Sequence, residues 1–391
     1  MASCFAHAGV AATGTCDKCQ TPICMRCTKG TLEGFMCPPC AHKTYGRRKL
    51  VTALKIAGLV GFCLAIGLLA LVVIGKGSRN EKPKPPVLRD PDPEIAIMLD
   101  ERDQAPCDRR LIRKLADRLG QLDRYKDVVD HTSAFFAKCG AFPRLEWSVV
   151  YALQQLGRYA EAVKHETVII EDDPFDSDYW WWRGEDRARS NQPDLALADY
   201  RQSFANSESE RGGRFAAVRV LDVAGPASKG CEGVWAIRYY ERALGGSPGD
   251  DLRRRADGLA QAGQCEQQGG TGAALMAPDA ADGTVRAAVT IGTATATLVV
   301  DPRAGTTVVS RDVATRAGLA TTGPTVQTVA GNVLRSGTLV TTAVAVGEAR
   351  AAAVEVMIVD GLPAGVDGYL GLSFLWTFGT IGVVGGVSVG P

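Results

Sequence analysis

The position of the cysteines constrains this chain more than any other feature. Seven of the 12 cysteines in 391 residues lie before residue 41, and with one histidine they form pairs separated by two residues. Each pair places two ligands across a tight turn, where both can reach one tetrahedral Zn²⁺. Eight ligands suffice for two closed sites, so we expect two structural zinc ions that supply the folding free energy of this small segment. The expected ligands are Cys4, His7, Cys16, Cys19, Cys24, Cys27, Cys37 and Cys40.

Residues 1–45 resemble the B-box type of zinc finger, in which alternate pairs share a metal. The resemblance implies two ligand sets: Cys4, His7, Cys24 and Cys27 for one ion, and Cys16, Cys19, Cys37 and Cys40 for the other. His42 is an alternative to Cys40. Spacing by itself gives pairs and not partners, and a disulfide or iron–sulfur cluster is the competing interpretation; His7 favours zinc.

An apolar run at residues 50–74 predicts a transmembrane helix. Residues 56–74 carry no charge, close to the length of about 20 residues that spans a bilayer. The preceding zinc segment argues against a cleaved signal peptide, and a buried soluble helix is the alternative. Ala57, Gly61 and Ala65 form a small-residue stripe that suits close approach of a second helix, or is merely part of a span rich in small residues. Residues 75–94 read as an extended, Pro-rich linker.

The orientation follows from cysteine chemistry, because basic residues flank the apolar run about equally. Thiolate ligands are safest in a reducing compartment, so we expect the N-terminus in the cytoplasm and the C-terminal region outside, in the periplasm of a bacterium. The net charge of +1 argues against nucleic-acid binding by bulk charge.

Residues 95–265 show a helical pattern with a period of 34. Leu122 and Leu156 are separated by that interval, as are Tyr125 and Tyr159. The run Leu156-Gly-x-Tyr-x-x-Ala162 resembles the tetratricopeptide repeat, which implies stacked helix pairs and a protein or extended-peptide partner. A later unit at residues 236–244 fits if about six residues are inserted near residues 225–233. The aromatic run at residues 179–182 is either a binding surface or core.

Four further cysteines lie in this region and at its end: Cys107, Cys139, Cys231 and Cys265. They lack the spacing of metal ligands, so outside the cytoplasm they are expected to form two disulfides. Three pairings are possible. Proximity in sequence favours Cys107–Cys139 and Cys231–Cys265, and free buried thiols are the alternative.

Residues 272–391 are expected to form an all-β domain. From residue 283 onward the chain has no lysine, and short alternating runs are punctuated by Gly, Asn and Asp. We expect strands at residues 285–291, 295–300, 326–329, 338–346 and 354–359, and a short helix at residues 311–319.

Residues 298–310 resemble the catalytic loop of the retropepsin-like aspartic peptidases, whose motif is Asp-Thr-Gly-Ala-Ser. Residues 329–333 look like the family's flap, and residues 367–375 look like its closing segment, with Gly371 as its glycine. The resemblance implies a β-barrel in which Asp301 is the one catalytic carboxylate. A second must come from a homodimer partner, because the two carboxylates share a proton. Asp367 lies where the family places no catalytic residue.

The motif departs from the family directly after Asp301. Pro302 replaces the threonine whose hydroxyl braces the two loops of a dimer, and Arg303 replaces the glycine. A positive charge there adds bulk and works against proton sharing. We therefore expect a catalytically impaired peptidase homologue that binds protein or peptide partners. The alternatives are an active membrane-anchored aspartic endopeptidase working as a homodimer through Asp301, and a cytoplasmic zinc-module adaptor with a structural exoplasmic part.

Overall fold

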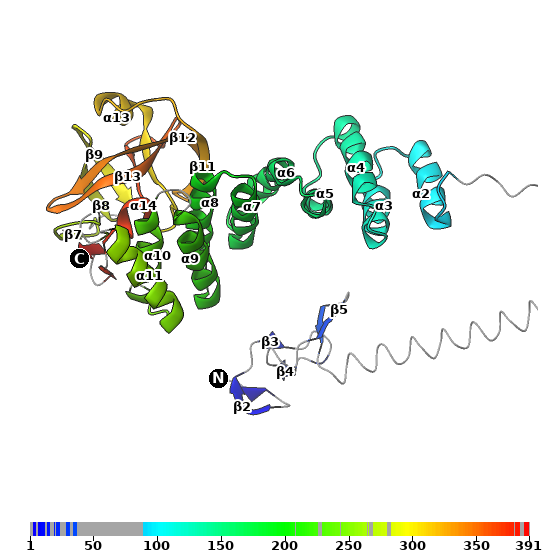
Figure 1. Ribbon diagram of the computed structural model, residues 1–391, viewed down its shortest axis with the longest axis horizontal. Coiled ribbons are helices and arrows are strands. Elements are labelled where there is room, and N and C mark those ends of the chain that lie inside the picture. The colour runs from blue at the N-terminus through cyan, green and yellow to red at the C-terminus, as the bar shows by residue number, and fades with distance from the viewer. Residues whose placement is uncertain are drawn as a thin grey trace, which may run out of the picture. The chain divides into compact units, whose positions relative to one another are not determined.

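The computed structural model divides the chain into two compact units, Met1–Pro86 and Val87–Pro391, each of which is described by itself (Figure 1). In the first unit it describes six short strands and residues 19 and 21. In the second unit it describes residues 89–390 apart from 208, 226–228, 243, 264, 266–268, 280–282, 379 and 384–386.

The strands of the first unit pair as three antiparallel hairpins. They are β1 (Ser3–Cys4) with β2 (His7–Ala11), β3 (Gly14–Thr15) with β4 (Pro22–Ile23), and β5 (Lys29–Thr31) with β6 (Gly34–Met36). Two of the expected zinc ligands face each other in this register, because Cys4 pairs with His7. Cys19 lies in a turn between β3 and β4 and is exposed.

The remaining expected zinc ligands, Cys16, Cys24, Cys27, Cys37 and Cys40, lie outside the described residues, as do the predicted transmembrane helix at 50–74 and most of the linker. Among the residues that are described, no group of His, Cys, Asp or Glu could hold a metal ion. No helix in the described part of the chain is long and apolar enough to cross a membrane. The zinc sites, the B-box resemblance and the membrane span therefore stay predictions.

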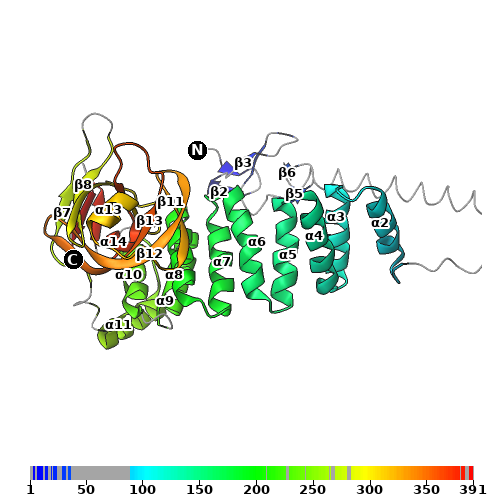
Figure 2. The same ribbon diagram turned by 90° about the horizontal axis from the view of Figure 1, so that it is seen from above.

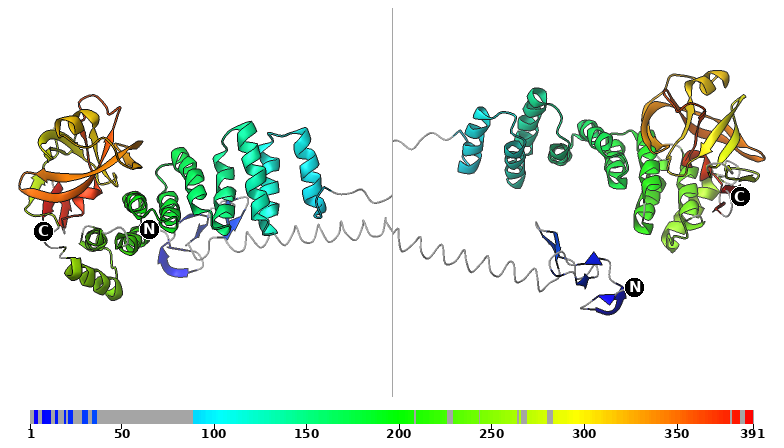
Figure 3. Two further views of the ribbon diagram at one scale, coloured as in Figure 1. Left: turned by 45° about the horizontal axis from the view of Figure 1, so that its top comes forward. Right: turned by 180° about the vertical axis from the view of Figure 1, so that it is seen from behind.

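The second unit begins with a row of antiparallel helices, shown side by side in Figures 2 and 3. Asp92 and Asp108 cap the first two by accepting hydrogen bonds from backbone amides. The helices are α2 (Pro93–Gln104), α3 (Arg109–Gln121), α4 (Tyr125–Cys139), α5 (Pro143–Gln155), α6 (Tyr159–Asp172), α7 (Ser177–Arg189), α8 (Pro193–Asn206), α9 (Glu210–Ala224), α10 (Gly230–Arg242) and α11 (Asp250–Gly263).

The predicted period of 34 is confirmed by the backbone. Asp123, Gly157 and Asn191 lie 34 residues apart in the turns between α3 and α4, α5 and α6, and α7 and α8. All three have a positive φ, of 56°, 70° and 60° respectively. The same left-handed turn therefore closes three consecutive helix pairs. It is tolerated because Gly has no Cβ, and Asn and Asp adopt this conformation more readily than other residues.

The next pair departs from the period by less than the sequence suggested. Helix α10 begins at Gly230, which is 37 residues after the start of α8 at Pro193, so about three extra residues are accommodated and not about six. Gly233 lets α10 approach α9 closely, since a Cβ there would lie 2.7 Å from the Cα of Leu221. Gly233 therefore makes the close contact between these helices, whereas the sequence placed the small residue of this repeat at Ala236.

Two disulfides fasten the ends of the array, and both predicted pairings are confirmed. Cys107 is bonded to Cys139, with Cα atoms 5.5 Å apart, and joins the start of α3 to the end of α4. Cys231 is bonded to Cys265, with Cα atoms 5.2 Å apart, and joins α10 to the segment after α11. Each bond closes a loop of a little over 30 residues and so restricts the unfolded chain.

The rest of the second unit is β-rich. Its main sheet has the order β11-β12-β13-β10-β14-β9-β8, and β12 also pairs with β8, so the pairings close on themselves. The elements are β7 (Ala274–Met276), β8 (Arg286–Ile291), β9 (Ala294–Val300), β10 (Thr307–Ser310), α13 (Arg311–Arg316), β11 (Thr325–Ala330), β12 (Val333–Val346), β13 (Ala349–Val359), β14 (Gly368–Leu370), α14 (Leu372–Leu375), β15 (Thr380–Val383) and β16 (Val387–Gly390).

All five predicted strands are present, and the short helix α13 lies within its predicted range. The sequence missed β10 and β14, which form parallel pairs with β13 and β9 respectively and lie in the middle of the sheet. These strands are buried throughout or nearly so, and therefore lack the alternation that marks a half-exposed strand.

The helical array and the β-rich part share hydrophobic cores. Ala198 of α8 packs with Ala304, Val308 and Tyr369 of the β-rich part. Trp180 of α7 packs with Val329 of β11. Figure 2 shows α8 alongside β11. The two parts therefore form one folded unit in which α8 is covered on all sides: residues 196–204 are buried without interruption.

Candidate active site

Asp301 follows β9 directly and begins the loop that leads to β10. The loop is fixed by its backbone: the amide of Asp301 donates to the carbonyl of Leu370 at 3.0 Å, and the amide of Leu372 donates to the carbonyl of Ala304 at 2.8 Å. Gly371 allows this close approach, because a Cβ there would lie 2.6 Å from the Ala304 carbonyl oxygen. The resemblance placed Asp301 in the catalytic loop and Gly371 in the closing segment, and the structure brings these two segments together.

The carboxylate of Asp301 is held by backbone amides on both oxygens. The Arg303 amide donates to Oδ1 at 3.0 Å, and the Gly331 amide donates to Oδ2 at 2.8 Å. Gly331 and Asn332 form the turn between β11 and β12, with φ of 61° and 58°. This hairpin is the expected flap, and its tip rests on the carboxylate.

The turn of the flap also packs against Tyr369. A Cβ on Gly331 would lie 2.2 Å from the hydroxyl oxygen of Tyr369, so only glycine allows this contact. The guanidinium of Arg335 lies 5.5 Å from the centre of the Tyr369 ring and donates to the Ala330 carbonyl at 3.0 Å. The turn of the flap is therefore fixed by contacts to both the Asp301 carboxylate and Tyr369.

Two of the three residues that depart from the family motif are exposed. Pro302 and Arg303 both have exposed side chains, so the arginine is not packed inside this domain. The backbone of Arg303 has a different role, because its carbonyl accepts a hydrogen bond from the side-chain amide of Gln202 at 3.0 Å.

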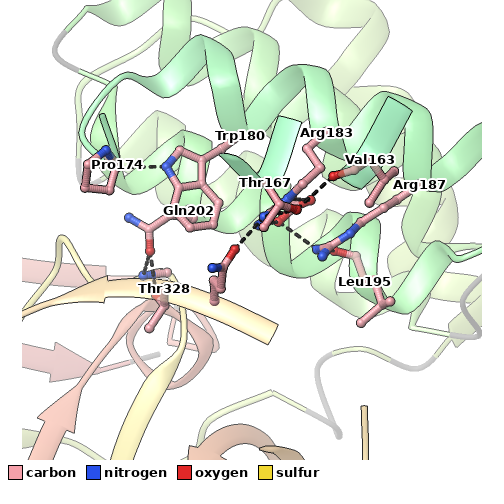
Figure 4. Close-up of polar contacts among 12 residues, drawn as sticks. Val163, Thr167, Pro174, Trp180, Arg183, Arg187, Leu195, Gln202 and Thr328 are labelled. Atoms are coloured by element: carbon pink, nitrogen blue, oxygen red, sulfur yellow. Dashed lines mark hydrogen bonds and ion pairs between the residues drawn. The ribbon is translucent and has the colours of Figure 1, made fainter. Parts of the chain in front are cut away.

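Gln202 of α8 reaches into the loop and ties it to the array. Its Oε1 accepts from the amides of Gly305 at 3.0 Å and Val329 at 2.9 Å, and from the hydroxyl of Thr328 at 2.5 Å. Figure 4 shows Gln202 directed at Thr328 on the underlying strand. One buried side chain thus joins the helix, the Asp301 loop and the flap strand, and satisfies amides that would otherwise be buried without partners.

Gly305 stands where the family motif has serine, and the position of α8 explains the change. A Cβ on Gly305 would lie 2.7 Å from the backbone nitrogen of Gln202 and 2.8 Å from its Cα. Backbone atoms in a packed helix cannot yield as a flexible side chain can. The glycine therefore belongs to the contact with the helix.

A buried ionic cluster fastens the neighbouring part of α8 to β13. Arg201 contacts Glu355 of β13 and pairs with Glu232 of α10 at 2.7 Å, and Lys229 also contacts Glu355. Burial acts to raise the pKa of Glu355, but the charges of Arg201 and Lys229 hold it below its usual range. Burial raises the pKa of Glu232.

A second polar cluster joins α7 and α8 to β11. Arg183 is fully buried and donates to both carboxylate oxygens of Asp199, at 3.0 Å and 2.7 Å. It also donates to Gln327 of β11 at 2.5 Å. Arg187 pairs with the same Asp199 at 2.8 Å. Figure 4 shows Arg183 and Arg187 converging between the helices above the strand.

Asp367 and the aromatic run at residues 179–182 were also singled out in the sequence. The carboxylate of Asp367 accepts from the Thr297 amide at 2.9 Å and lies outside the Asp301 loop. In the aromatic run at residues 179–182, Trp180 is buried and Trp182 is 37% exposed, so one serves the core and the other the surface.

Comparisons with known proteins agree with this part of the fold. Residues 287–374 match the family model described as aspartyl protease. This stretch contains Asp301, the flap and Gly371. The match supports a retropepsin-like domain in this part of the chain. No curated protein matches the chain.

Solved structures give only remote likeness. Two structures of MamA are 12% and 11% identical, with TM-scores of 0.33 and 0.32; they cover 38% and 44% of this chain and 79% and 88% of their own. A retropepsin-like aspartic protease from Rickettsia conorii is 17% identical, with a TM-score of 0.24, covering 30% of this chain and 89% of its own.

Sequence reasoning missed Gln202 and the ionic residues around it. No motif contains Gln202, and its partners in the Asp301 loop and the flap strand lie 101 to 127 residues away in the chain. The one available signal was the run of polar residues between the apolar positions of α8, which an exposed helix shows equally well.

Proposed function

We propose that this chain is a single-pass membrane protein whose exoplasmic part is a peptidase homologue that does not cleave and that binds protein or peptide partners. The observation that carries the proposal is the contact of α8 with the Asp301 loop through Gln202. Aspartic peptidase chemistry needs two carboxylates that share a proton across an activated water. The retropepsin resemblance supplies one per chain, so the second must come from another copy.

The geometry around Asp301 opposes that requirement. Backbone amides of the same chain hold the carboxylate in place through both oxygens, and the loop face next to Gly305 is covered by the backbone of α8. In the family a threonine hydroxyl braces the two loops of a dimer. Here Pro302 lacks that hydroxyl, and Gln202 braces the loop from within the same chain.

The test is a cleavage assay on the purified full-length chain. A broad peptide library is incubated from about pH 3 to pH 8, the range in which a carboxylate pair can share a proton. We expect no cleavage that pepstatin inhibits and no difference between the native chain and Asp301→Asn. Cleavage that is abolished by Asp301→Asn would instead establish the alternative, a membrane-anchored aspartic endopeptidase acting as a homodimer.

We propose further that residues 1–45 bind two structural zinc ions. The hairpin that pairs Cys4 with His7 supports this, because both residues lie at the same level of one β-ladder. Zinc content is measured by mass spectrometry on the full chain and on Cys4→Ser and Cys16→Ser. We expect two ions per chain and a loss of about one in each variant. Equal zinc in all three chains would contradict the site.

The proposed topology places this zinc segment in the cytoplasm and residues 75–391 outside. The two disulfides support that assignment, because such bonds persist in oxidising compartments. A reporter active only outside the cytoplasm is fused to Pro391, and we expect it to be active. A silent reporter on an expressed fusion would reverse the topology. Comparing partners recovered with and without residues 1–45 tests the remaining alternative, a cytoplasmic zinc adaptor.

A further inference from the structure

A groove lies between α9 and α11 at the end of the helical array, away from the Asp301 loop. Its volume is about 740 Å³, and Tyr240 of α10, which is fully buried, lies beneath it. An ion pair of 2.7 Å between Arg255 and Asp222 holds α11 against α9. The described residues that line it are Arg211, Arg214, Phe215, Val218, Tyr240, Ser247 and Leu252.

The groove has an apolar floor and an apolar rim. Phe215, which lines the groove, is 51% exposed. Val218 and Leu252 are half-buried beside Phe215. Large apolar side chains left open around a concave site favour a partner that brings an apolar side chain of its own.

Two arginines give the same groove a positive character. The guanidinium of Arg211 lies 5.5 Å from the centre of the Phe215 ring, and that of Arg214 donates to the Pro248 carbonyl at 3.1 Å. Both side chains are otherwise exposed. No acidic residue is among the described residues that line the groove. The arginines are thus held in place beside an apolar surface and are available to carboxylates.

We propose that this groove binds an acidic peptide segment in which an aromatic or aliphatic side chain is flanked by Asp or Glu. The apolar side chain would pack on Phe215, Val218 and Leu252, and the carboxylates would pair with Arg211 and Arg214. The inference rests on the proposal that the exoplasmic part is a binding scaffold, and it names the class of partner. It does not depend on the state of Asp301.

Fluorescence anisotropy on the purified full-length chain tests this inference. The probe is a short labelled peptide with a central Leu-Phe pair flanked by Asp and Glu, and its control carries Lys at every acidic position. We expect the acidic probe to bind at least about tenfold more tightly than the basic one, and less tightly as salt rises. Arg211→Glu and Phe215→Ala should each weaken binding by about tenfold or more. Arg113→Glu, an exposed arginine on α3, should leave binding within about twofold.

Equal binding of the two probes, or no loss in Arg211→Glu and Phe215→Ala, would overturn the inference. Both substituted side chains are exposed, and circular dichroism verifies that the variants fold. Failure of this inference and failure of the proposed function give different results. Failure of the groove leaves recovery of partners by other surfaces intact, whereas pepstatin-sensitive cleavage of the probe refutes the non-cleaving homologue even if the groove binds.

Discussion

The side-chain nitrogen of Gln202 lies 3.0 Å from the carbonyl oxygen of Arg303, so a helix of the array holds the backbone of the residue that breaks the peptidase motif. Two residues that depart from the motif, Arg303 and Gly305, therefore both contact α8. Arg303 exposes its side chain while its carbonyl serves the helix, and Gly305 makes room for the helix backbone.

Gln202→Met should destabilise the second unit. Methionine has a similar volume but leaves the amides of Gly305 and Val329 buried without an acceptor. Each unsatisfied amide costs about 1–3 kcal/mol, so we expect a loss of about 2–6 kcal/mol in the free energy of unfolding measured in urea. Gln155→Met, at the end of α5, is the control. A loss no larger than that of the control would contradict the role given to Gln202.

Restoring the serine of the family motif should harm the fold. In Gly305→Ser the added Cβ meets the backbone of Gln202 at 2.7 Å, and neither side can move without shifting α8. Overpacking of this kind costs about 1–3 kcal/mol. Gly258→Ser on α11 is the matched control, because a Cβ there has no neighbour within 4 Å. Equal urea midpoints for the two variants would show that α8 does not press on the loop.

Repairing the motif beside Asp301 should not restore cleavage. The double variant Pro302→Thr/Arg303→Gly regains two family residues, but Gln202 still ties the loop to α8 and the flap turn still contacts the carboxylate. We expect no pepstatin-sensitive cleavage of the peptide library. Cleavage by this variant that disappears on adding Asp301→Asn would place the impairment in Pro302 and Arg303 alone.

Glu355→Gln tests the ionic cluster between α8 and β13. The change leaves Lys229 without its partner on β13 and Arg201 with only Glu232. Removing one member of a buried pair costs about 3–5 kcal/mol, so the urea midpoint should fall clearly. Asp360→Asn removes one partner of the exposed pair with Arg311 and should change the midpoint little. Similar midpoints for both variants would mean that the buried cluster is not stabilising.

Glu166 should make stability depend on pH. It lies buried in α6, facing Arg183, Arg187, Asp186 and Asp199, and neither of its oxygens has a hydrogen-bond partner. Burial raises its pKa to about 9, so the folded chain keeps a proton that the unfolded chain releases above its ordinary pKa of 4.5. The contribution of Glu166 to the free energy of unfolding is therefore fully present below pH 4.5, and it is lost as pH rises towards 9.

Glu166→Gln removes this dependence. Relative to the native chain, its melting temperature should be similar at about pH 4 and higher by several degrees at about pH 8. The control is Glu171→Gln, an exposed carboxylate on the same helix, which should follow the native chain at both values. If the difference does not grow with pH, Glu166 is ionised in the folded state.

Local patterns predicted much of this fold. The period of 34 was visible because each helix pair repeats one left-handed turn, at Asp123, Gly157 and Asn191. Strands β8 and β9 alternate between buried and exposed residues and were found, whereas the nearly continuously buried β10 gave no alternation. The disulfide pairs followed from proximity in sequence.

The relation between the array and the Asp301 loop could not be predicted in this way. Gln202 is a polar residue on a helix, and its buried position follows only from the packing of β11 and the loop against α8. The sequence placed the bulk and charge of Arg303 next to Asp301, but it did not show that this side chain is exposed.

The shared core between α8 and the β-rich part has a consequence for synthesis. The ribosome completes α8 well before β9 and the Asp301 loop emerge, so the helix is already present when the loop forms. Residues 272–391 made alone would leave the amides of Gly305 and Val329 unpaired and Ala304 uncovered. The composition changes near residue 272. The β-rich part after this boundary nevertheless folds against α8, which lies before it.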